Sequence, residues 1–316
     1  MIVVTSGTPY VDIDAFGCGV AYAELLRLSG TPAQAVFEAT LNESIPSVLR
    51  ALLPDYTSRY QPNDQDQFVL VDVSDPEHFE PFVDLDRLTG VIDHHPGFEA
   101  YWQGKIGAEA ANIEFIGAAC TQVYELWETA GMVSKMSTTS ALLLASGILD
   151  NTLNFKAHVS TERDKKAYEV LRRQGSIAED WPATYFTACQ QAIVASIGQA
   201  ITNDFKQFPE YPAMPHTLGQ LVIWDAKPVI AANLAEISEI LAAKNREWAI
   251  NIVSIFEGRS YFFASASAQP KLEALAGVTF AATGIARAGR LWLRKELLKE
   301  ASADSLRTKN NSPRKG

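Results

Sequence analysis

Carboxylate and imidazole side chains follow apolar segments in four places of this sequence. They are Asp12 and Asp14, Asp72, the triplet Asp93, His94 and His95, and Asp150. In an open parallel sheet, side chains that follow the strands converge at one edge, where ligands bind. Carboxylates brought together in this way repel one another strongly unless cations neutralise them or some of them are protonated. The pattern therefore predicts a site for divalent metal ions.

The mixture of carboxylate and imidazole ligands favours particular metals. Manganese, cobalt, iron and zinc accept both ligand types, whereas calcium takes oxygen ligands almost exclusively. Two ions about 3.5–4 Å apart that share a carboxylate would hold a water molecule with a pKa of roughly 7 and direct it at a phosphorus atom. The chemistry that this pattern predicts is the hydrolysis of a phosphate compound.

Simpler structural roles also fit single members of this set. Asp12 or Asp14 alone fits equally well as the N-cap of a helix that begins near Ala15. Asp75, which precedes Pro76, is more typical of a helix cap than of a ligand. Adjacent histidines are usually hydrogen-bonded structural groups. The position of the whole set after strand-like segments is what favours the metal site.

The segments that must position these residues alternate between strands and helices. The sequence predicts strands at 2–5, 35–37, 68–73 and 90–93, and helices at 15–30, 44–53, 117–131 and 137–149. Gly30 is expected to end the first of these helices. Alternating strands and helices indicate an α/β protein whose parallel sheet is covered by helices on its faces.

Length and composition indicate two domains. The chain has 316 residues, and its 47% of hydrophobic residues is enough for a core in each domain. Near 205–219 the pattern breaks at three prolines, and a new series of strand-like segments follows. We predict an α/β domain at 1–195, a second, smaller α/β domain at 196–300 and a disordered tail at 301–316.

Charge and composition exclude several classes of protein. A net charge of −10 repels polyanions, so we expect no nucleic acid polymer as a partner. No segment approaches the roughly 18 apolar residues of a membrane span, and no signal peptide is apparent, so we expect a cytoplasmic protein without a membrane partner. Cys18, Cys120 and Cys189 are too dispersed for a disulfide framework or a zinc site, and we expect buried thiols.

Four motifs make the chain resemble the DHH phosphoesterase superfamily. They are DID at 12–14, LVDV at 70–73, VIDHH at 91–95 and GILDNTLNF at 147–155. The second domain is similar to the DHHA2 type of manganese-dependent family II inorganic pyrophosphatases, exopolyphosphatases and prune-like proteins. LNES at 41–44, NDFKQF at 203–208 and a basic C-terminal segment support that likeness. The glycine-rich GGGH-type motif of the branch with RecJ nucleases and small-oligonucleotide phosphodiesterases is absent from the sequence.

The resemblance implies that two domains close over a phosphate substrate, with the active site in the cleft between them. It implies two divalent ions, manganese or else magnesium or cobalt. One would be held by Asp14, Asp72, His94 and Asp150, and the other by Asp12 and Asp72. The implied catalytic residues are His95, Asp72 and Asp93, and His95 would contact the substrate or protonate the leaving phosphate. The implied substrate-binding residues are His95, Lys206, Arg287, Arg290, Arg294 and Lys295.

The sequence departs from the family pattern in three places. Thr8 stands where the pyrophosphatases have a histidine ligand and prune and yeast-type exopolyphosphatases have asparagine, which is expected to loosen one metal and shift preference toward magnesium. The C-terminal basic motif is altered. On a helix, Arg287, Arg290 and Arg294 would share one face, either as phosphate ligands or as a solvated flank. An alignment on NFK would place Asn151 at the ligand position, and we choose Asp150 because a carboxylate binds cations better.

These observations favour a metal-dependent phosphohydrolase that cleaves phosphoanhydride bonds of inorganic pyrophosphate or short polyphosphate. A nucleotide phosphodiesterase of the same superfamily is the alternative within enzymes. A weakly active protein that binds metal and phosphate to regulate a partner is the alternative outside them. The sequence leaves the oligomeric state open, a homodimer included.

Overall fold

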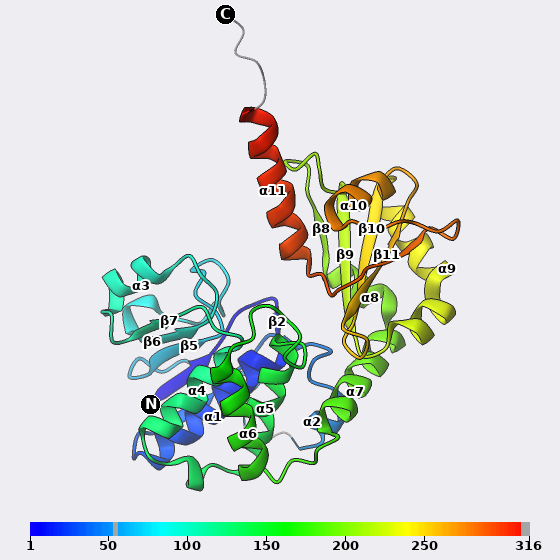
Figure 1. The fold of residues 1–316 in the computed structure, drawn as a ribbon. Helices are drawn as coiled ribbons and strands as arrows, with labels where there is room; N and C mark the ends of the chain where they lie inside the picture. Colours follow the sequence, from blue (N-terminus) through cyan, green and yellow to red (C-terminus); the bar gives the residue numbers. More distant parts are fainter. Residues whose placement is uncertain (53–55, 311–316) are drawn as a thin grey trace, which may run out of the picture. The chain divides into compact units, whose positions relative to one another are not determined.

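The computed structural model describes residues 1–52 and 56–310, with the backbone alone described for 303–310. The chain divides into two compact units, Met1–Ala188 and Cys189–Gly316 (Figure 1). The boundary falls inside helix α7 (Trp181–Ala195), which therefore belongs to both units. The boundary that we predict from the sequence, after residue 195, lies instead at the end of this helix.

The first unit is built on a parallel sheet. Its strands run in the order β3-β1-β5-β6-β7, and every neighbouring pair is parallel. The strands are β1 (Ile2–Thr5), β3 (Ala33–Ala35), β5 (Gln67–Val71), β6 (Leu88–Asp93) and β7 (Ala111–Ile113). A separate parallel pair consists of β2 (Tyr10–Val11) and β4 (Thr40–Leu41). The predicted parallel sheet is confirmed, although β3 begins two residues before the segment predicted for it.

Helices cover both faces of this sheet. They are α1 (Ile13–Leu28), α2 (Ser47–Arg50), α3 (Glu99–Ile106), α4 (Ala119–Thr129), α5 (Thr138–Asn151) and α6 (Glu162–Gln174), with short 3-10 turns at Leu85–Arg87 and Val133–Lys135. Helices α1 and α4 contact the strands, and α5 and α6 pack against them as an outer layer (Figure 1). On the other face, Trp102 of α3 packs with Val3, Phe68 and Leu70. Gly30, with a φ of 87°, follows the end of α1 as expected.

The second unit has a mixed sheet in the order β12-β11-β10-β9-β8. Its elements are α8 (Ile197–Asn203), β8 (Phe205–Gln207), β9 (Thr217–Ile223), α9 (Ala226–Lys244), β10 (Trp248–Ser254), β11 (Arg259–Ala264), α10 (Gln269–Ala276), β12 (Ile285–Arg287) and α11 (Arg294–Asn310). Only β9 and β10, which α9 connects, pair in parallel within these described strands. Ile237 of α9 and Leu297 of α11 belong to separate cores, so helices cover both faces here as well.

Helix α11 extends into the segment for which the sequence predicts a disordered tail. Residues 301–310 continue α11, which runs from Arg294 to Asn310. Alanine, leucine, lysine and arginine are good helix formers, and the first proline of this stretch is Pro313, so nothing in its composition stops the helix earlier. Residues 311–316 lie outside the described residues.

Candidate metal centre

The strand-end residues of the first unit converge at the carboxyl edge of the parallel sheet. Asp72 directly follows β5, and Asp93 ends β6 and leads into His94 and His95. The His94 Nε2 atom lies 3.4 Å from Asp72 Oδ1 and 3.8 Å from Asp14 Oδ2. Asp72 Oδ1 also lies 3.9 Å from the His95 Nδ1 atom. The convergence that the sequence predicts is therefore present in the structure.

The ring of His94 is oriented so that one nitrogen faces these carboxylates. Its Nδ1 lies 3.1 Å from the Ile116 carbonyl oxygen, which can only accept, so we assign the hydrogen to Nδ1. Nε2 then carries a lone pair. Across residues 1–52 and 56–302, the buried atoms without a hydrogen-bond partner include both His94 Nε2 and Asp72 Oδ1. Two unpaired acceptors that face each other in a buried place fit a divalent cation between them, and ligand atoms of Asp72, His94 and His95 lie within 4.8 Å of one another.

Asp72 has an unusual backbone conformation. Its φ is 56°, in the left-handed region, and its N–H donates to the Ile92 carbonyl oxygen at 2.8 Å. Aspartate and asparagine tolerate this region better than other residues that carry a Cβ atom. The turn lifts the Asp72 side chain out of the strand direction and toward His94. Such conformations are concentrated at functional sites.

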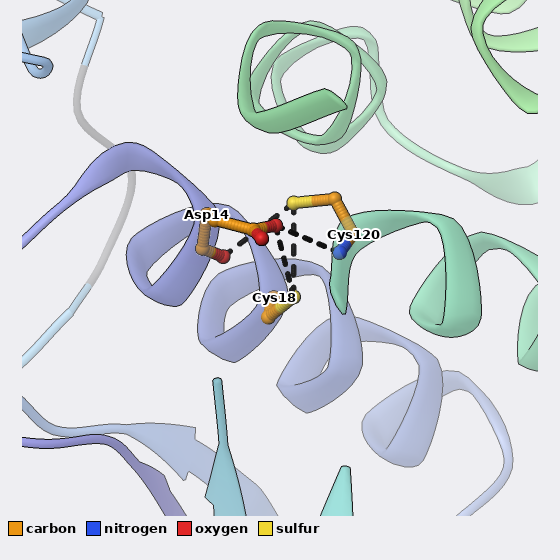
Figure 2. A group of neighbouring side chains, drawn as sticks. All are labelled: Asp14, Cys18 and Cys120. Atoms are coloured by element: carbon orange, nitrogen blue, oxygen red, sulfur yellow. Dashed lines mark hydrogen bonds between the residues drawn. The ribbon is translucent and has the colours of Figure 1, made fainter. Parts of the chain in front are cut away.

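Asp14 is completely buried and its carboxylate is held by helix α4. Oδ2 accepts a hydrogen bond from Ala119 N–H at 2.9 Å, and Oδ1 accepts one from Cys120 N–H at 2.8 Å. Figure 2 shows this carboxylate beside the thiols of Cys18 and Cys120, whose sulfur atoms are 3.6 Å apart. Asp14 thus satisfies two free N–H groups at the start of α4, where Ala118 provides no side-chain cap. The expected burial of the three thiols is confirmed.

Asp12 and Asp150 complete the group of carboxylates. Asp12 is the N-cap of α1, because its Oδ1 accepts from Ala15 N–H at 3.0 Å, so the simpler role considered for it is confirmed without excluding metal binding. Asp150, in the last turn of α5, lies 2.9 Å from the hydroxyl of Tyr185. Burial, and after it the charges of Asp12 and Asp14, raise the pKa of Asp150 to about 7. The charges of Asp12 and Asp14 thus act on Asp150, and its role as a ligand stays a prediction.

The same two causes act on the neighbouring acids. Burial, followed by the charges of Asp14 and Asp12, raises the pKa of Asp72 well above its ordinary range. Burial and the charge of Asp14 also raise the pKa of Asp12. Without cations the group can relieve its repulsion only by holding protons, and bound cations would replace those protons.

His95 and Asp93 form a hydrogen-bonded pair at the rim of this group. His95 Nδ1 lies 2.8 Å from Oδ1 of the buried Asp93, while 63% of the His95 side chain is exposed. Loss of hydration is the largest single influence and works against the charged imidazole, but the bond to Asp93 and the charges of Asp72 and Asp93 together raise the pKa of His95. Burial alone would raise the pKa of Asp93, but the same bond, the charge of His95 and a hydrogen bond from Ser74 together lower it. The pair can hold a proton on His95 at an exposed position.

The predicted substrate-binding residues lie in the second unit, but not on one helix. Arg287 ends β12 and pairs with Tyr261 of β11, Arg290 lies in the following loop, and Arg294 begins α11. The helix that their spacing suggests is therefore wrong, because strand pairing fixes the chain up to Arg287. Lys206 lies on the exposed part of β8, and Lys295 is the exposed second residue of α11.

Acidic partners accompany the three arginines. Arg287 lies 3.6 Å from Glu257, and Arg290 lies 2.9 Å from Glu296 and stacks on Trp292. Arg294 binds Asp204 through both Nη atoms, which contact its carboxylate and its carbonyl oxygen at 2.5 and 2.6 Å. This bond brings the NDFKQF segment and the basic segment together. An arginine that binds phosphate here would have to exchange its carboxylate partner.

Several curated proteins are similar to this chain in sequence. No protein-family model matches the chain. A "probable manganese-dependent inorganic pyrophosphatase" of Deinococcus radiodurans is 26% identical over 241 residues, which cover 74% of each chain. One of Bacillus licheniformis is 25% identical over 280 residues, which cover 85% of this chain and 88% of the other. The chain is a distant homologue of manganese-dependent inorganic pyrophosphatases. The resemblance to the DHH superfamily is thus confirmed.

Solved structures show the same fold. A crystal structure named "Methanococcus jannaschii putative family II inorganic pyrophosphatase" matches 96% of this chain and all of its own, with a TM-score of 0.64 and 18% identity. An exopolyphosphatase-related protein of Bacteroides fragilis matches 98% of this chain and 92% of its own, with a TM-score of 0.53 and 13% identity. The predicted α/β architecture, with a parallel sheet first and a second sheet after it, is confirmed in this form. Among the described helices, none has the length and apolar character of a membrane span.

Sequence reasoning missed the groups that orient the carboxylates and imidazoles. The Ile116 carbonyl oxygen and the N–H groups of Ala119 and Cys120 are backbone atoms, so residue type carries no signal for them. Tyr185 reaches Asp150 across 35 positions of sequence. Cys18 could have been placed beside Asp14, because residues four apart on a helix share a face.

We expect the stability of the metal-free protein to fall as pH rises. The pKa of Asp150 is about 7 in the folded chain against an ordinary value of 3.8. Between those values the folded chain holds a proton that the unfolded chain has released, so the stabilisation present at about pH 4 is lost by about pH 7. Urea unfolding of EDTA-treated protein across this range measures the effect. The Asp150→Asn variant should show a flatter profile, and an equal slope in both proteins would contradict the assignment.

Proposed function

We propose that the chain is a divalent-metal-dependent hydrolase of phosphoanhydride bonds, with inorganic pyrophosphate or short polyphosphate as its substrate. The distant homology to manganese-dependent inorganic pyrophosphatases suggests this class of reaction. The observation that carries the proposal is the pair of buried, unpaired acceptors, His94 Nε2 and Asp72 Oδ1, within the described residues. They face each other at 3.4 Å beside Asp14, where a cation rather than a hydrogen would satisfy them.

The residues of the first unit divide into two roles in this proposal. Asp12, Asp14, Asp72, His94 and Asp150 hold two divalent ions, manganese by likeness to the homologues and with magnesium or cobalt as substitutes. When bound, such ions neutralise phosphate oxygens and lower the pKa of water to roughly 7. The unpaired acceptor atoms of Asp72 and His94 support their roles as ligands. The mutual repulsion of the carboxylates supports the roles of Asp12, Asp14 and Asp150.

His95 supplies the proton in this proposal. As water oxygen bonds to the phosphorus atom and the bridging P–O bond breaks, the leaving phosphate takes up negative charge. His95 donates a proton to that oxygen from its exposed side, while Asp93 fixes the ring through Nδ1 at 2.8 Å. By the same family likeness, Lys206, Arg287, Arg290, Arg294 and Lys295 are proposed to bind phosphate oxygens.

A phosphate-release assay tests the function. EDTA-treated protein is supplied in turn with manganese, magnesium or cobalt, and with pyrophosphate, tripolyphosphate, long polyphosphate or a dinucleotide. We expect release from pyrophosphate or tripolyphosphate that requires a metal and stops when EDTA is added again. The ratio of manganese to magnesium activity also measures the effect of Thr8.

Two results would overturn the proposal. Turnover of the dinucleotide without release from either anhydride would assign the protein to the phosphodiesterases. Binding of metal without turnover of any substrate would instead favour the regulatory alternative, for which the carboxylate partners of the three arginines would be the structural reason.

A further inference from the structure

The buried side chain of Tyr185 lies beside Asp150, one of the carboxylates of the candidate metal centre. Tyr185 of α7 is 0% exposed, and its hydroxyl lies 2.9 Å from Asp150 Oδ1 and 2.9 Å from the carbonyl oxygen of Ser44. Its ring packs on Trp181 and Phe186, at centroid distances of 6.2 and 5.0 Å. Packing of the ring against these two aromatic side chains therefore fixes the position of the hydroxyl.

Ser44 connects this hydroxyl to the start of helix α1. The Ser44 Oγ atom accepts a hydrogen bond from the N–H of Ile13 at 2.9 Å. Ile13 stands between Asp12 and Asp14 in the sequence. Ser44 in turn donates to Asn42 Oδ1 through its N–H at 2.9 Å and its hydroxyl at 2.6 Å. The hydroxyl carries a single hydrogen and the Ser44 carbonyl oxygen can only accept, so we assign the donated hydrogen bond to the stronger acceptor, the Asp150 carboxylate, with Ser44 as a close neighbour of the phenol oxygen.

We propose that Tyr185 is a positioning residue that sets the orientation of the Asp150 carboxylate for cation binding. The proposal rests on the proposed function, because it takes Asp150 as a cation ligand. A carboxylate at the end of a helix can rotate about its last torsion, and a hydrogen bond to Oδ1 fixes that rotation and leaves Oδ2 for the cation. Hydrogen bonds of this kind to metal ligands typically change metal affinity by about 10–100-fold.

Tyr185 lies on the helix that connects the two units, so its contact with Asp150 depends on that helix. Helix α7 is the segment that continues from the first unit into the second, and Tyr185 stands three residues before the boundary at Ala188. The group that orients Asp150 thus belongs to the connecting helix rather than to the sheet or its covering helices. A displacement of α7 would therefore act on Asp150 through the Tyr185 hydroxyl.

The Tyr185→Phe variant tests the proposal, with manganese binding by isothermal titration calorimetry as the readout. The ring and its packing remain, and we expect manganese to bind about 10–100-fold more weakly. Tyr124→Phe is the matched control, since Tyr124 is also buried and its hydroxyl lies 3.2 Å from Glu128, away from the carboxylate group. It should bind manganese as the wild type does.

A double-mutant cycle separates positioning from a general effect on the fold. If Tyr185 acts through Asp150, Tyr185→Phe should cause no further loss of affinity in an Asp150→Asn background. Equal affinity of Tyr185→Phe and the wild type, or additive losses in the double variant, would overturn the proposal and leave the proposed function standing. Absence of binding of manganese, magnesium and cobalt by the wild type would instead overturn the proposed function itself.

Discussion

Replacement of Asp72 by alanine is expected to abolish metal-dependent phosphate release while the fold stays intact. Asp72 is the proposed shared ligand of both ions, and its Oδ1 lies within 3.9 Å of both His94 and His95. Loss of a shared ligand should cost several kcal/mol of transition-state stabilisation, and each ~1.4 kcal/mol is a factor of about ten in rate. Steady-state phosphate release with saturating manganese measures the loss, and circular dichroism checks the fold.

The left-handed backbone of Asp72 calls for a second variant. Alanine at a φ of 56° adds strain of about 1–2 kcal/mol that has no connection with metal binding. Asp72→Asn avoids most of that strain and removes only the charge, so it should be inactive and close to wild type in stability. Asp75→Asn is the control, because Asp75 is half-buried outside the carboxylate group and its bond to Glu77 N–H can be kept by asparagine. An Asp72 variant that retains more than about a tenth of the wild-type rate would contradict the two-metal proposal.

The Gly147→Ala substitution is expected to destabilise the first unit and to disturb the metal centre together. A Cβ atom at this position of α5 would lie 2.5 Å from Cys120 Sγ, 3.1 Å from Asp14 Cα and 3.2 Å from Asp14 Oδ1. Overpacking of this kind costs about 1–3 kcal/mol, because neighbouring helices have to move apart. Urea unfolding measures the loss of stability, and calorimetry with manganese measures the displacement of Asp14.

Another helical glycine supplies the comparison. At Gly104 of α3, the described residues leave the space around an added Cβ atom open to 4 Å. Gly104→Ala should therefore raise stability by about 0.4–1 kcal/mol, the usual gain when a helical glycine is replaced. Adding Cys120→Ala to Gly147→Ala removes the closest clash and should recover most of the lost stability. If Gly147→Ala is as stable as Gly104→Ala, the close packing of α1, α4 and α5 is contradicted.

The convergence of the strand-end side chains can be predicted from the sequence because it follows from the topology of the sheet. Once alternating strands and helices indicate a parallel sheet, Asp72 and the Asp93–His95 triplet must meet at its carboxyl edge. The aspartates at the start of α1 follow the first strand and arrive at the same edge. These placements need residue type and order along the chain, and both can be read from the sequence.

The remaining features depend on contacts that the sequence does not encode locally. The i, i+3, i+7 spacing of the three arginines fits a helix, but pairing of β12 with β11 decides the conformation of Arg287. The carboxylate of Asp14 is oriented by backbone N–H groups of α4, more than a hundred residues away. Tyr185 lies in a helix whose apolar composition indicates burial and nothing more. Long-range packing, rather than propensity, settles each of these cases.

The candidate metal ligands are dispersed along the chain, which affects when a cation can bind relative to folding. The candidate ligands come from four separate segments between Asp12 and Asp150, and three of them depend on the assembled sheet. An unfolded chain presents at most two of these side chains close together in sequence, so we expect capture of a cation to follow folding rather than to direct it. The identity of the ion is then decided by the supply of the cell and the shape of the finished site, because nitrogen and oxygen ligands by themselves bind zinc more tightly than manganese.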